Sequence, residues 1–367
     1  MISNKFIFYL VIIIFLLSKN TFSLSKDYKF TLLKKDLNSP WSISFIDENE
    51  IIISEKTGKI KLLNLINDNI VEINHNLNVI EDNNSQGGLL EILYHDNNIY
   101  ISYAEKRGEF KLYGPSSTSI AKAKFNKEKL NFKNLFRANP PIRSPYHFGS
   151  RMIIKGNHLY ASVGERGKGM IAQETDKHPG SIIRINLDGS VPLDNPKYIN
   201  QPTWLPEMFQ IGIRNPQGMA LSPFDNKIYI SNHGARGGDW FGQVKKGENY
   251  GWKILGWGGK NYNMSKIGPK WLPGYTKAIQ YWVPSIATSA IAIYNGNEFP
   301  EFEGLALITS LKAQSLISLN FSNLENVIEK IIFEKEIGRI RDIKIHPKNG
   351  KIYLLAQDKL WLFEKNN

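Results

Sequence analysis

The sequence predicts an all-β protein, and more specifically a six-bladed β-propeller with four-stranded antiparallel blades. Long stretches with helical periodicity are absent, and short β-branched runs such as 51–54 and 227–231 recur along the chain between turn-forming residues. Aromatic residues make up 12% of the 367 residues, and the 29 Gly and 17 Pro are scattered throughout, which is typical of an all-β protein with many turns. One propeller can absorb the whole length without a second domain.

One arrangement occurs six times: a short polar motif, an apolar run expected to be an inner strand, and a second short strand. The polar motifs lie at 38–41, 86–89, 147–151, 214–218, 284–287 and 339–342. The second strands are expected at 51–54, 99–102, 159–162, 228–231, 305–309 and 352–356. Their spacing of roughly 45 to 80 residues suits blades repeated around an axis with loops of variable length. The six motifs would then meet at one mouth of the ring.

The two ends of the chain carry separate expectations. Lys5, the apolar run 6–17 and the small residues Thr21 and Ser23 predict a signal peptide, 1–23, cleaved after Ser23. An uncleaved anchor is the alternative, but an apolar run of about 12 residues is short for a membrane span of roughly 20. The propeller would occupy 24–367 and reach the periplasm or the medium with no stable membrane span after cleavage. The segment 354–363 is expected to pair with N-terminal residues and close the ring.

Composition excludes several classes of site and partner. The chain contains no Cys, so it has no disulfides, Cys nucleophile or thiolate metal site. Its net charge is +12, but the basic residues form no dense stripe, which argues against a nucleic-acid partner. We attribute most of this charge to solvated loops, and we except the cations inside the repeated motifs.

His147 is the leading candidate for a general base, because a neutral imidazole accepts a proton near physiological pH. Glu165 follows the expected strand 159–162, and neighbouring strands of one blade would bring it beside His147. A carboxylate in that place fixes the imidazole tautomer. The alternatives are a structural His147 and an ion pair between Glu165 and Arg166.

Several cations lie in or beside the motifs. Arg214 and Asn215 open the fourth motif, and Lys312, Arg339 and Arg341 belong to the fifth and sixth repeats. Singly, each cation fits a solvated surface. Gathered at one mouth they would repel one another unless an anion lies among them, so a polyanionic small ligand is expected.

Two further features allow more than one interpretation. The Gly-rich segment 232–239 follows a strand and could present carbonyls to a hard cation such as calcium, present amides to an anion, or form a tight turn. Trp282 could stack on a flat ligand or pack in the core.

The motifs together resemble the soluble quinoprotein glucose/sorbosone dehydrogenases, especially the aldose sugar dehydrogenase branch. The similar segments cover nearly all of the mature chain in the same order: 40–43, 86–90, 147–151, 164–167, 180–186, 188–189, 214–218, 233–234, 237–239, 249–252, 284–287, 310–312 and 339–342. The resemblance implies a propeller that holds pyrroloquinoline quinone (PQQ) and calcium and oxidises an aldose at C1 to the lactone. The electron acceptor stays unknown.

The resemblance also implies roles for individual residues. His147 would take the proton of the anomeric hydroxyl while hydride passes to the quinone, with Glu165 supporting the imidazole and Arg214 stabilising charge on the quinone oxygen. The cofactor would contact Gln86, Arg214, Asn215, Trp282, Lys312, Arg339 and Arg341. The backbone carbonyls of Gly234 and Ala235 would bind the calcium ion at the quinone.

Some positions depart from the family pattern. Asn232 and Ala235 stand where the family has Glu and Pro. A second calcium would keep Asp239 and Tyr250, but Trp240 replaces an acidic residue there. Thr288 and Ala290 replace Pro and Gly in a loop expected to shape the substrate pocket.

Two other functions fit a six-bladed propeller. One is a calcium-dependent lactonase using Asn215, Glu165 and Asp239, which would leave the cations unexplained. The other is a non-enzymatic module of the envelope that binds a protein or glycan.

Overall fold

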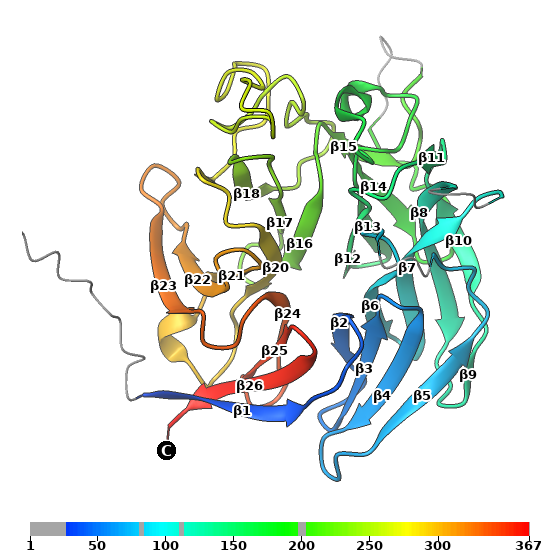
Figure 1. Cartoon of the computed structure of the whole chain (residues 1–367), viewed down its shortest axis with the longest axis vertical. Coiled ribbons are helices and arrows are strands. Elements are labelled where there is room, and N and C mark those ends of the chain that lie inside the picture. The colour runs from blue at the N-terminus through cyan, green and yellow to red at the C-terminus, as the bar shows by residue number, and fades with distance from the viewer. Residues whose placement is uncertain (1–26, 81–83, 110–113, 197–202, 367) are drawn as a thin grey trace, which may run out of the picture.

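The computed structural model describes residues 27–80, 84–109, 114–196 and 203–366, and the predicted signal peptide lies outside these ranges. Six sheets stand around a common centre, with the innermost strands labelled nearest to it (Figure 1). The innermost strands contact one another in sequence, and the last one, β24, also contacts β2, the first. The predicted six-bladed propeller is confirmed.

Each blade has four main antiparallel strands, and in the first five blades these follow one another outward from the centre in chain order. The innermost strands are β2 (Pro40–Phe45), β6 (Leu89–His95), β12 (Gly149–Lys155), β16 (Pro216–Leu221), β20 (Thr288–Ile293) and β24 (Ile340–Ile345). The second strands are β3 (Glu50–Glu55), β7 (Asn98–Lys106), β13 (His158–Val163), β17 (Ile228–Asn232), β21 (Ala306–Ser310) and β25 (Ile352–Ala356). All six predicted second strands therefore exist where the sequence placed them, to within a few residues at their ends.

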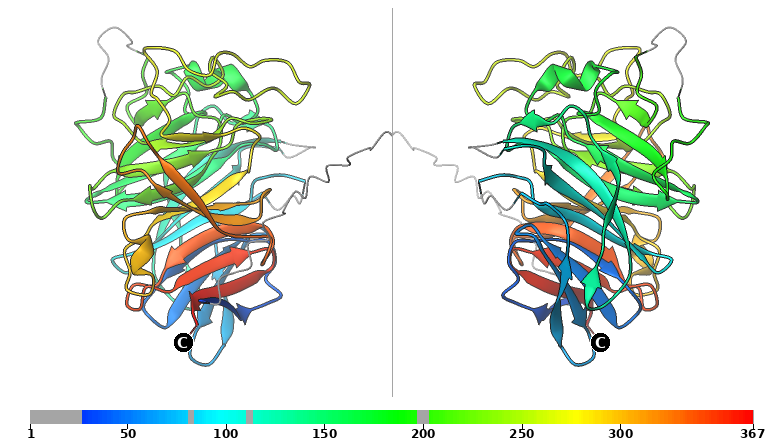
Figure 2. Two further views of the ribbon diagram at one scale, coloured as in Figure 1. Left: turned by 90° about the vertical axis from the view of Figure 1, so that its left-hand side faces the viewer. Right: turned by 90° about the vertical axis from the view of Figure 1, so that its right-hand side faces the viewer.

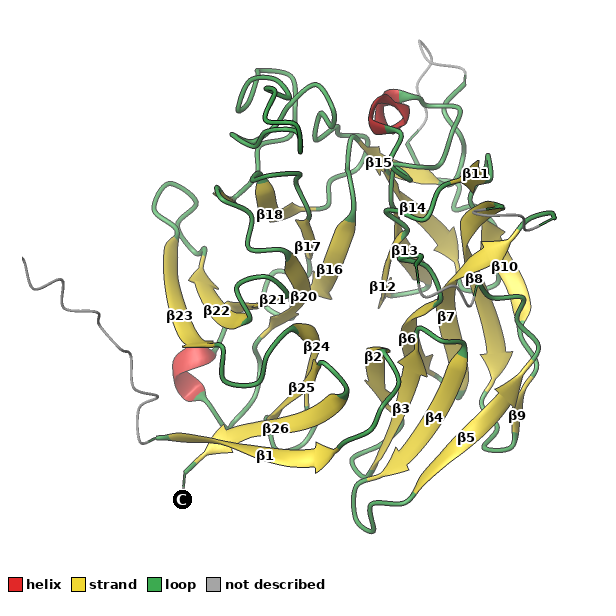
Figure 3. Ribbon diagram, viewed as in Figure 1, coloured by secondary structure: helices red, strands yellow, loops and turns green. Residues whose placement is uncertain are grey.

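The outer half of each blade is less regular. The third strands are β4 (Lys59–Asn64), β8 (Pro115–Lys124), β14 (Ser181–Asn186), β18 (Asp239–Gln243), β22 (Ser315–Asn320) and β26 (Lys359–Lys365). The outermost are β5 (Ile70–His75), β10 (Lys133–Arg137), β15 (Met208–Ile211), β19 (Gln280–Trp282), β23 (Ile328–Glu334) and β1 (Tyr28–Lys34), with the short β9 (Lys129–Leu130) and β11 (Ile142–Arg143) added to two sheets. Helix is limited, in the described part of the chain, to two 3₁₀ turns, η1 (Gly169–Gln173) and η2 (Pro300–Phe302) (Figure 3).

The ring is closed by the two ends of the chain. β1 pairs antiparallel with β26, from Tyr28 opposite Lys365 to Lys34 opposite Leu360. The N-terminal strand thus becomes the outermost strand of the C-terminal blade (Figure 1). This pairing confirms the predicted closure and hides an otherwise exposed strand edge.

The hydrophobic core lies between neighbouring blades. Ile52 of β3, Ile92 of β6 and Ile101 of β7 are fully buried in one cluster that joins the first two blades. Burying each such side chain contributes roughly 1.5–3 kcal/mol. With no Cys in the sequence, these inter-blade clusters take the place of disulfides in holding the blades together.

The longest excursion from the blades joins β18 to β19 and stands out from the sheets in the side views (Figure 2). It spans 244–279 and contributes to the cavities described below. Across the described residues, the model has no helix with the length and apolarity needed to cross a membrane.

Candidate active site

All six innermost strands have a β-bulge at their first residues. The register shifts fall at Pro40/Ser42, Leu89/Ile92, Gly149/Met152, Pro216/Gly218, Thr288/Ile291 and Ile340/Asp342. A bulge bends its strand and redirects the adjacent side chains. Because these strands start at the same end of the ring, their polar motifs gather at one mouth, as the sequence predicted.

Three adjoining cavities lie at this mouth. The first, of about 680 Å³, is lined by residues that include Gly234, Ala235, Asp239 and Lys312. The second, of about 300 Å³, is lined by residues that include Gln86, Asn215, Arg339 and Arg341. The third, of about 480 Å³, is lined by residues that include Gln86, His147, Glu165 and Arg214. The first and second cavities share the wall residues His233 and Ala287, and the first and third share Ala235 and Tyr262. The second and third share Gln86, so the three cavities form one recess.

His147 and Glu165 form a hydrogen-bonded pair in the third cavity. Gly149 pairs with Val163 at the ends of β12 and β13, so His147, two residues before β12, lies beside Glu165, two residues after β13. His147 Nδ1 lies 2.6 Å from Glu165 Oε1, and Glu165 Oε2 accepts the amide N–H of Gly169 at 2.9 Å. With Nδ1 donating to the carboxylate, Nε2 of His147 keeps a lone pair for a proton.

The backbone around His147 is tightly constrained. His147 has a positive φ of 53°, and its amide N–H donates to Gln86 Oε1 at 2.9 Å. A Cβ at position 164 would lie only 2.0 Å from the carbonyl oxygen of His147. Gly164 is therefore required for the turn that presents the imidazole.

The surroundings of His147 shift its pKa in opposite directions. Burial lowers the pKa of His147 below its ordinary value, the hydrogen bond with Glu165 opposes this shift, and the nearby positive charge of Arg214 adds to it. Burial alone would raise the pKa of Glu165, but the hydrogen bond and charge of His147 bring it below its ordinary value. At neutral pH the pair is thus a carboxylate beside a neutral imidazole.

His233 is a second imidazole at the recess, and its environment differs. Burial lowers its pKa to about 4, and its Nε2 bonds the carbonyl oxygen of Thr288. With so low a pKa and no carboxylate bonded to its ring, His233 is a poorer candidate for a base than His147.

Arg214 and Asn215 are fixed by the strand beside them. Both of their amide N–H groups donate to Asn232 Oδ1, at 3.1 and 2.8 Å. The Arg214 guanidinium lies over the ring of Trp252, 5.3 Å from its centroid, and its Nε is 3.9 Å from Glu165 Oε1. Asn215 Oδ1 accepts the amide of Gly149, which leaves the NH₂ group of Asn215 as a donor for a ligand.

The expected cation cluster also exists. Arg341 Nη1 donates to Gln217 Oε1, and Arg339 Nη1 donates to the carbonyl oxygen of Leu311. Neither these two arginines nor Lys312 forms an ion pair with a described residue. Burial and the neighbouring charges of Arg151 and Arg339 lower the pKa of Arg341 to about 9. Lys312 and Arg339 are exposed and Arg341 is half-buried, and like charges gathered at one mouth favour the binding of an anion.

A second set of charges lies behind this cluster. Arg151 is 2% exposed, and its Nη1 lies 2.6 Å from Glu91 Oε2 and 2.8 Å from Asp342 Oδ1. Lys344 Nζ lies 3.1 Å from the other oxygen of Glu91. These residues come from β12, β6 and β24, so they meet at the centre of the ring. The other two nitrogens of Arg151 donate to the carbonyl oxygens of Gln217 and Arg341, which ties the network to the mouth.

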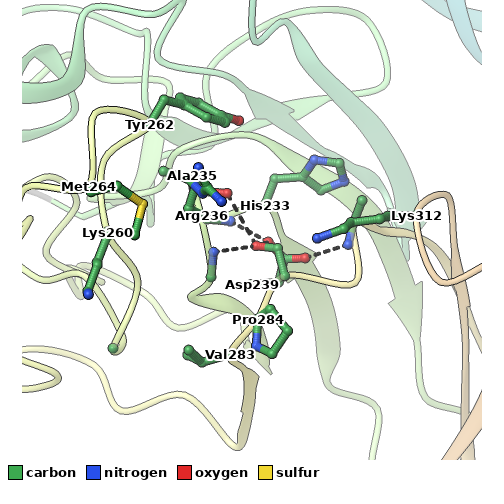
Figure 4. A pocket seen from close by; sticks show the side chains of 15 residues that line it. His233, Ala235, Arg236, Asp239, Lys260, Tyr262, Met264, Val283, Pro284 and Lys312 are labelled. Atoms are coloured by element: carbon green, nitrogen blue, oxygen red, sulfur yellow. Dashed lines mark hydrogen bonds between the residues drawn. The ribbon is translucent and has the colours of Figure 1, made fainter.

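Gly234 and Ala235 follow β17 and line the first cavity, close to Asp239 (Figure 4). Asp239 Oδ1 accepts the amide of Gly234 at 2.8 Å and the hydroxyl of Ser285 at 2.7 Å, and its Oδ2 accepts the amide of Ala287 at 2.7 Å. The carboxylate thus shapes the turn that carries the two carbonyls. Backbone carbonyls are suitable ligands for calcium.

The donors expected for a second calcium do not fit the ion. Both oxygens of Asp239 are engaged as above, and the hydroxyl of Tyr250 donates to the carbonyl oxygen of Gln243 at 2.8 Å. Trp240 stacks on Tyr250 with ring centroids 4.0 Å apart. No cluster of three metal-ligating carboxylate or imidazole side chains occurs among the described residues.

Trp282 lies in a core cluster and not in the walls of the recess. Trp282 packs with Tyr229 and Phe241 in a core cluster, and its indole N–H donates to Glu329 Oε2 at 3.0 Å. It does not line the three cavities of the mouth. Its place on the outermost strand β19 carries it away from the centre, and packing is the interpretation that holds.

Sequence reasoning did not single out several residues of the recess. Lys56, whose ammonium donates to the carbonyl oxygen of Ser85 at 2.7 Å, lines the second cavity, and Lys253 lines the third. Lys56 follows the second strand β3 as Glu165 follows the second strand β13. This equivalent position in the blade could have predicted that Lys56 lies at the mouth. Lys253 lies in the irregular excursion after β18 and gives no such signal.

The lactonase alternative lacks its metal cage. Asn215, Glu165 and Asp239 each use their oxygens for hydrogen bonds within the protein, and they line different cavities. The cavities lined by the unpaired cations, in contrast, share wall residues with the cavity that holds the His147–Glu165 pair.

Comparisons with known proteins agree with this arrangement. The family model described as "Glucose / Sorbosone dehydrogenase" matches residues 37–360. The chain is 30% identical to aldose sugar dehydrogenase YliI of Escherichia coli K12 over 344 residues, 89% of each chain. The apo-form crystal structure of the soluble aldose sugar dehydrogenase from Escherichia coli has a TM-score of 0.84 at 28% identity and covers 92% of this chain and 99% of that one. The PQQ-bound form of aldose sugar dehydrogenase from Streptomyces coelicolor, at 20% identity, shares the fold, with a TM-score of 0.74 and coverage of 94% and 100%.

Proposed function

Because the chain belongs to the glucose/sorbosone dehydrogenase family, we propose that it is a PQQ- and calcium-dependent aldose dehydrogenase that oxidises the sugar at C1 to the lactone. The observation that carries the proposal is the His147–Glu165 pair opening into the same recess as the unpaired cations Lys312, Arg339 and Arg341. Export to the periplasm or the medium is part of the proposal and rests on residues 1–23.

The residues of the recess fit the proposed cofactor. PQQ is flat and carries three carboxylates, and the walls offer Lys312, Arg339 and Arg341 without ion-pair partners among the described residues. Gln86 and the NH₂ of Asn215 would add neutral donors, and the carbonyls of Gly234 and Ala235 would hold calcium. When bound, PQQ supplies the hydride acceptor and calcium supplies a Lewis acid.

The protein's own part in the chemistry is proton transfer and charge stabilisation. His147 Nε2 would take the proton of the anomeric hydroxyl, and the Glu165 carboxylate would stabilise the imidazolium so formed. Arg214, held between Trp252 and Glu165, would place a fixed positive charge where negative charge develops on an oxygen.

The test is reconstitution of the purified protein with PQQ and calcium, followed by dye reduction with a panel of aldoses. We expect a retained quinone absorbance band and sugar-dependent reduction. His147→Ala should keep the band and lower turnover by roughly 10²–10⁴-fold. Near-wild-type turnover in that variant would remove His147 from the role. Hydrolysis of lactones without dye reduction would favour the lactonase, and inertness in both assays would favour a binding module.

A further inference from the structure

The excursion between β18 and β19 has a one-sided charge. Residues 251–279 contain five Lys, at 253, 260, 266, 270 and 277, and no Asp or Glu. Two of them, Lys253 and Lys260, line cavities of the mouth. This segment therefore adds positive charge to the recess without compensating acids of its own.

Lys253 is the lysine that lines the cavity of the His147–Glu165 pair. An ideal Cβ at Gly169 would lie 2.9 Å from Lys253 Cδ and 3.9 Å from Nζ, so the lysine stem passes over this glycine. The amide of Gly169 is the group that donates to Glu165 Oε2. A side chain at position 169 would occupy the space that the lysine uses. The ammonium is thus held in the same cavity as the imidazole.

This ammonium is uncompensated. Within residues 27–80, 84–109, 114–196 and 203–366, Lys253 Nζ has no hydrogen bond or ion pair. The only acid lining the third cavity is Glu165, which is bound to His147 and lies close to Arg214. A half-buried cation in a cavity of net positive charge favours an anionic ligand.

The carboxylates of the proposed cofactor do not account for this charge. Lys312, Arg339 and Arg341 line the first and second cavities, whereas Lys253 lines the third, where the base lies. Arg236 and Lys260 add further cations to the first cavity, on the side of Tyr262 and Met264 (Figure 4). The space around His147 therefore remains positive when the cofactor's acids are matched.

We propose that the preferred substrate is an aldose that carries an anionic group, a carboxylate or a phosphate, away from C1, and that Lys253 selects it. This inference rests on the proposed function and names its substrate class. A neutral aldose offers the ammonium only hydroxyl oxygens, whereas a carboxylate or phosphate also brings the opposite charge. An acidic protein docked on the lysine rim is less well supported, because Lys253 is half-buried inside the cavity.

The experiment compares wild-type protein, Lys253→Met and the control Lys277→Met, each loaded with PQQ and calcium. Lys277 lies in the same excursion but is exposed and lines none of the three cavities. Calorimetry measures the affinity for methyl glucoside, methyl glucuronide and methyl glucoside 6-phosphate, which are blocked at C1. Dye reduction measures kcat/KM for glucose, glucuronate and glucose 6-phosphate.

We expect wild-type and Lys277→Met protein to favour at least one anionic sugar by about tenfold in both measurements, with the preference shrinking at high salt. Lys253→Met should lose the preference, with a loss of affinity and of kcat/KM for the anionic sugar about tenfold larger than any change for the neutral sugar. The two anionic arms show whether a carboxylate or a phosphate is selected.

The outcomes separate the two proposals. Equal affinity and equal kcat/KM for neutral and anionic sugars, or a preference that persists in Lys253→Met, would overturn the inference and leave the dehydrogenase proposal standing. A Lys253-dependent affinity for the blocked anionic sugars without oxidation of any aldose would support the anion site and contradict the proposed reaction.

Discussion

Two groups of cations lie next to each other at the centre and mouth of the ring, and they differ in their partners. Arg151 is buried and Lys344 and Arg341 are half-buried, whereas Lys312 and Arg339 are exposed. In the axial network, Arg151 and Lys344 contact the carboxylates of Glu91 and Asp342. At the mouth, Lys312, Arg339 and Arg341 have no acid among the described residues within ion-pair distance. Arg151, Lys344 and Arg341 lie on innermost strands, so position in the blade alone does not explain the difference.

The comparison separates cations that serve the fold from those that await a ligand. Taking a charge out of water costs several kcal/mol unless a counter-charge and hydrogen bonds compensate it. The axial network supplies that compensation within the protein. The mouth leaves its cations uncompensated, which is expected where the ligand brings the negative charge.

The largest effect is expected from breaking the axial network. Arg151→Met would leave the buried carboxylates of Glu91 and Asp342 without their guanidinium partner, so the free energy of unfolding should fall by about 3–5 kcal/mol. Equilibrium denaturation in urea measures it. Lys59→Met, which breaks an exposed pair with Glu72, is the control and should leave the midpoint unchanged. A stable Arg151→Met protein would show that the paired cations are not structural.

At the mouth, we expect a loss of cofactor affinity without a loss of stability. Lys312→Met should leave the unfolding free energy within about 0.5 kcal/mol of wild type, because it removes no internal partner. The affinity for PQQ should fall by about tenfold to a hundredfold through loss of one charge-assisted contact. Titration followed by quinone absorbance measures this, with exposed Lys335→Met as the control. Unchanged affinity would mean that Lys312 does not meet a carboxylate.

The smallest effect is expected from Glu165, the acid of the mouth that is paired with the base. Glu165→Gln removes the carboxylate that raises the pKa of His147, so this pKa should fall further. Since the base works when neutral, activity rises with pH through the pKa of His147, and the acid limb of the kcat/KM profile should move to lower pH. The weaker base should lower kcat/KM at neutral pH by about tenfold.

Glu165→Gln also tests how the charge of the mouth affects cofactor binding. Removing a negative charge from the mouth should not weaken PQQ binding, in contrast to Lys312→Met. A pH profile that keeps its acid limb in Glu165→Gln would dissociate that limb from His147.

The sequence was a good guide where a repeat was visible. The six polar motifs, each placed before an inner strand, located His147, Arg214, Asn215 and Arg341, because equivalent positions of a propeller meet at one end. It left two interpretations open for Trp282, whose aromatic side chain fits a ligand or a core equally well. It failed for Lys253, which lies in an irregular segment that has no counterpart in the other blades.

The sequence by itself therefore determined the number of blades, the closure of the ring and the gathering of base and cations at one mouth, since periodicity and turn chemistry are local properties of the chain. Only the tertiary structure decided which cations are paired. Arg151 meets Asp342 from 191 positions away, and the same axis leaves Lys312 without an acid. Such pairings depend on distances across the ring, which no local pattern encodes, and they distinguish a structural cation from one that awaits a ligand.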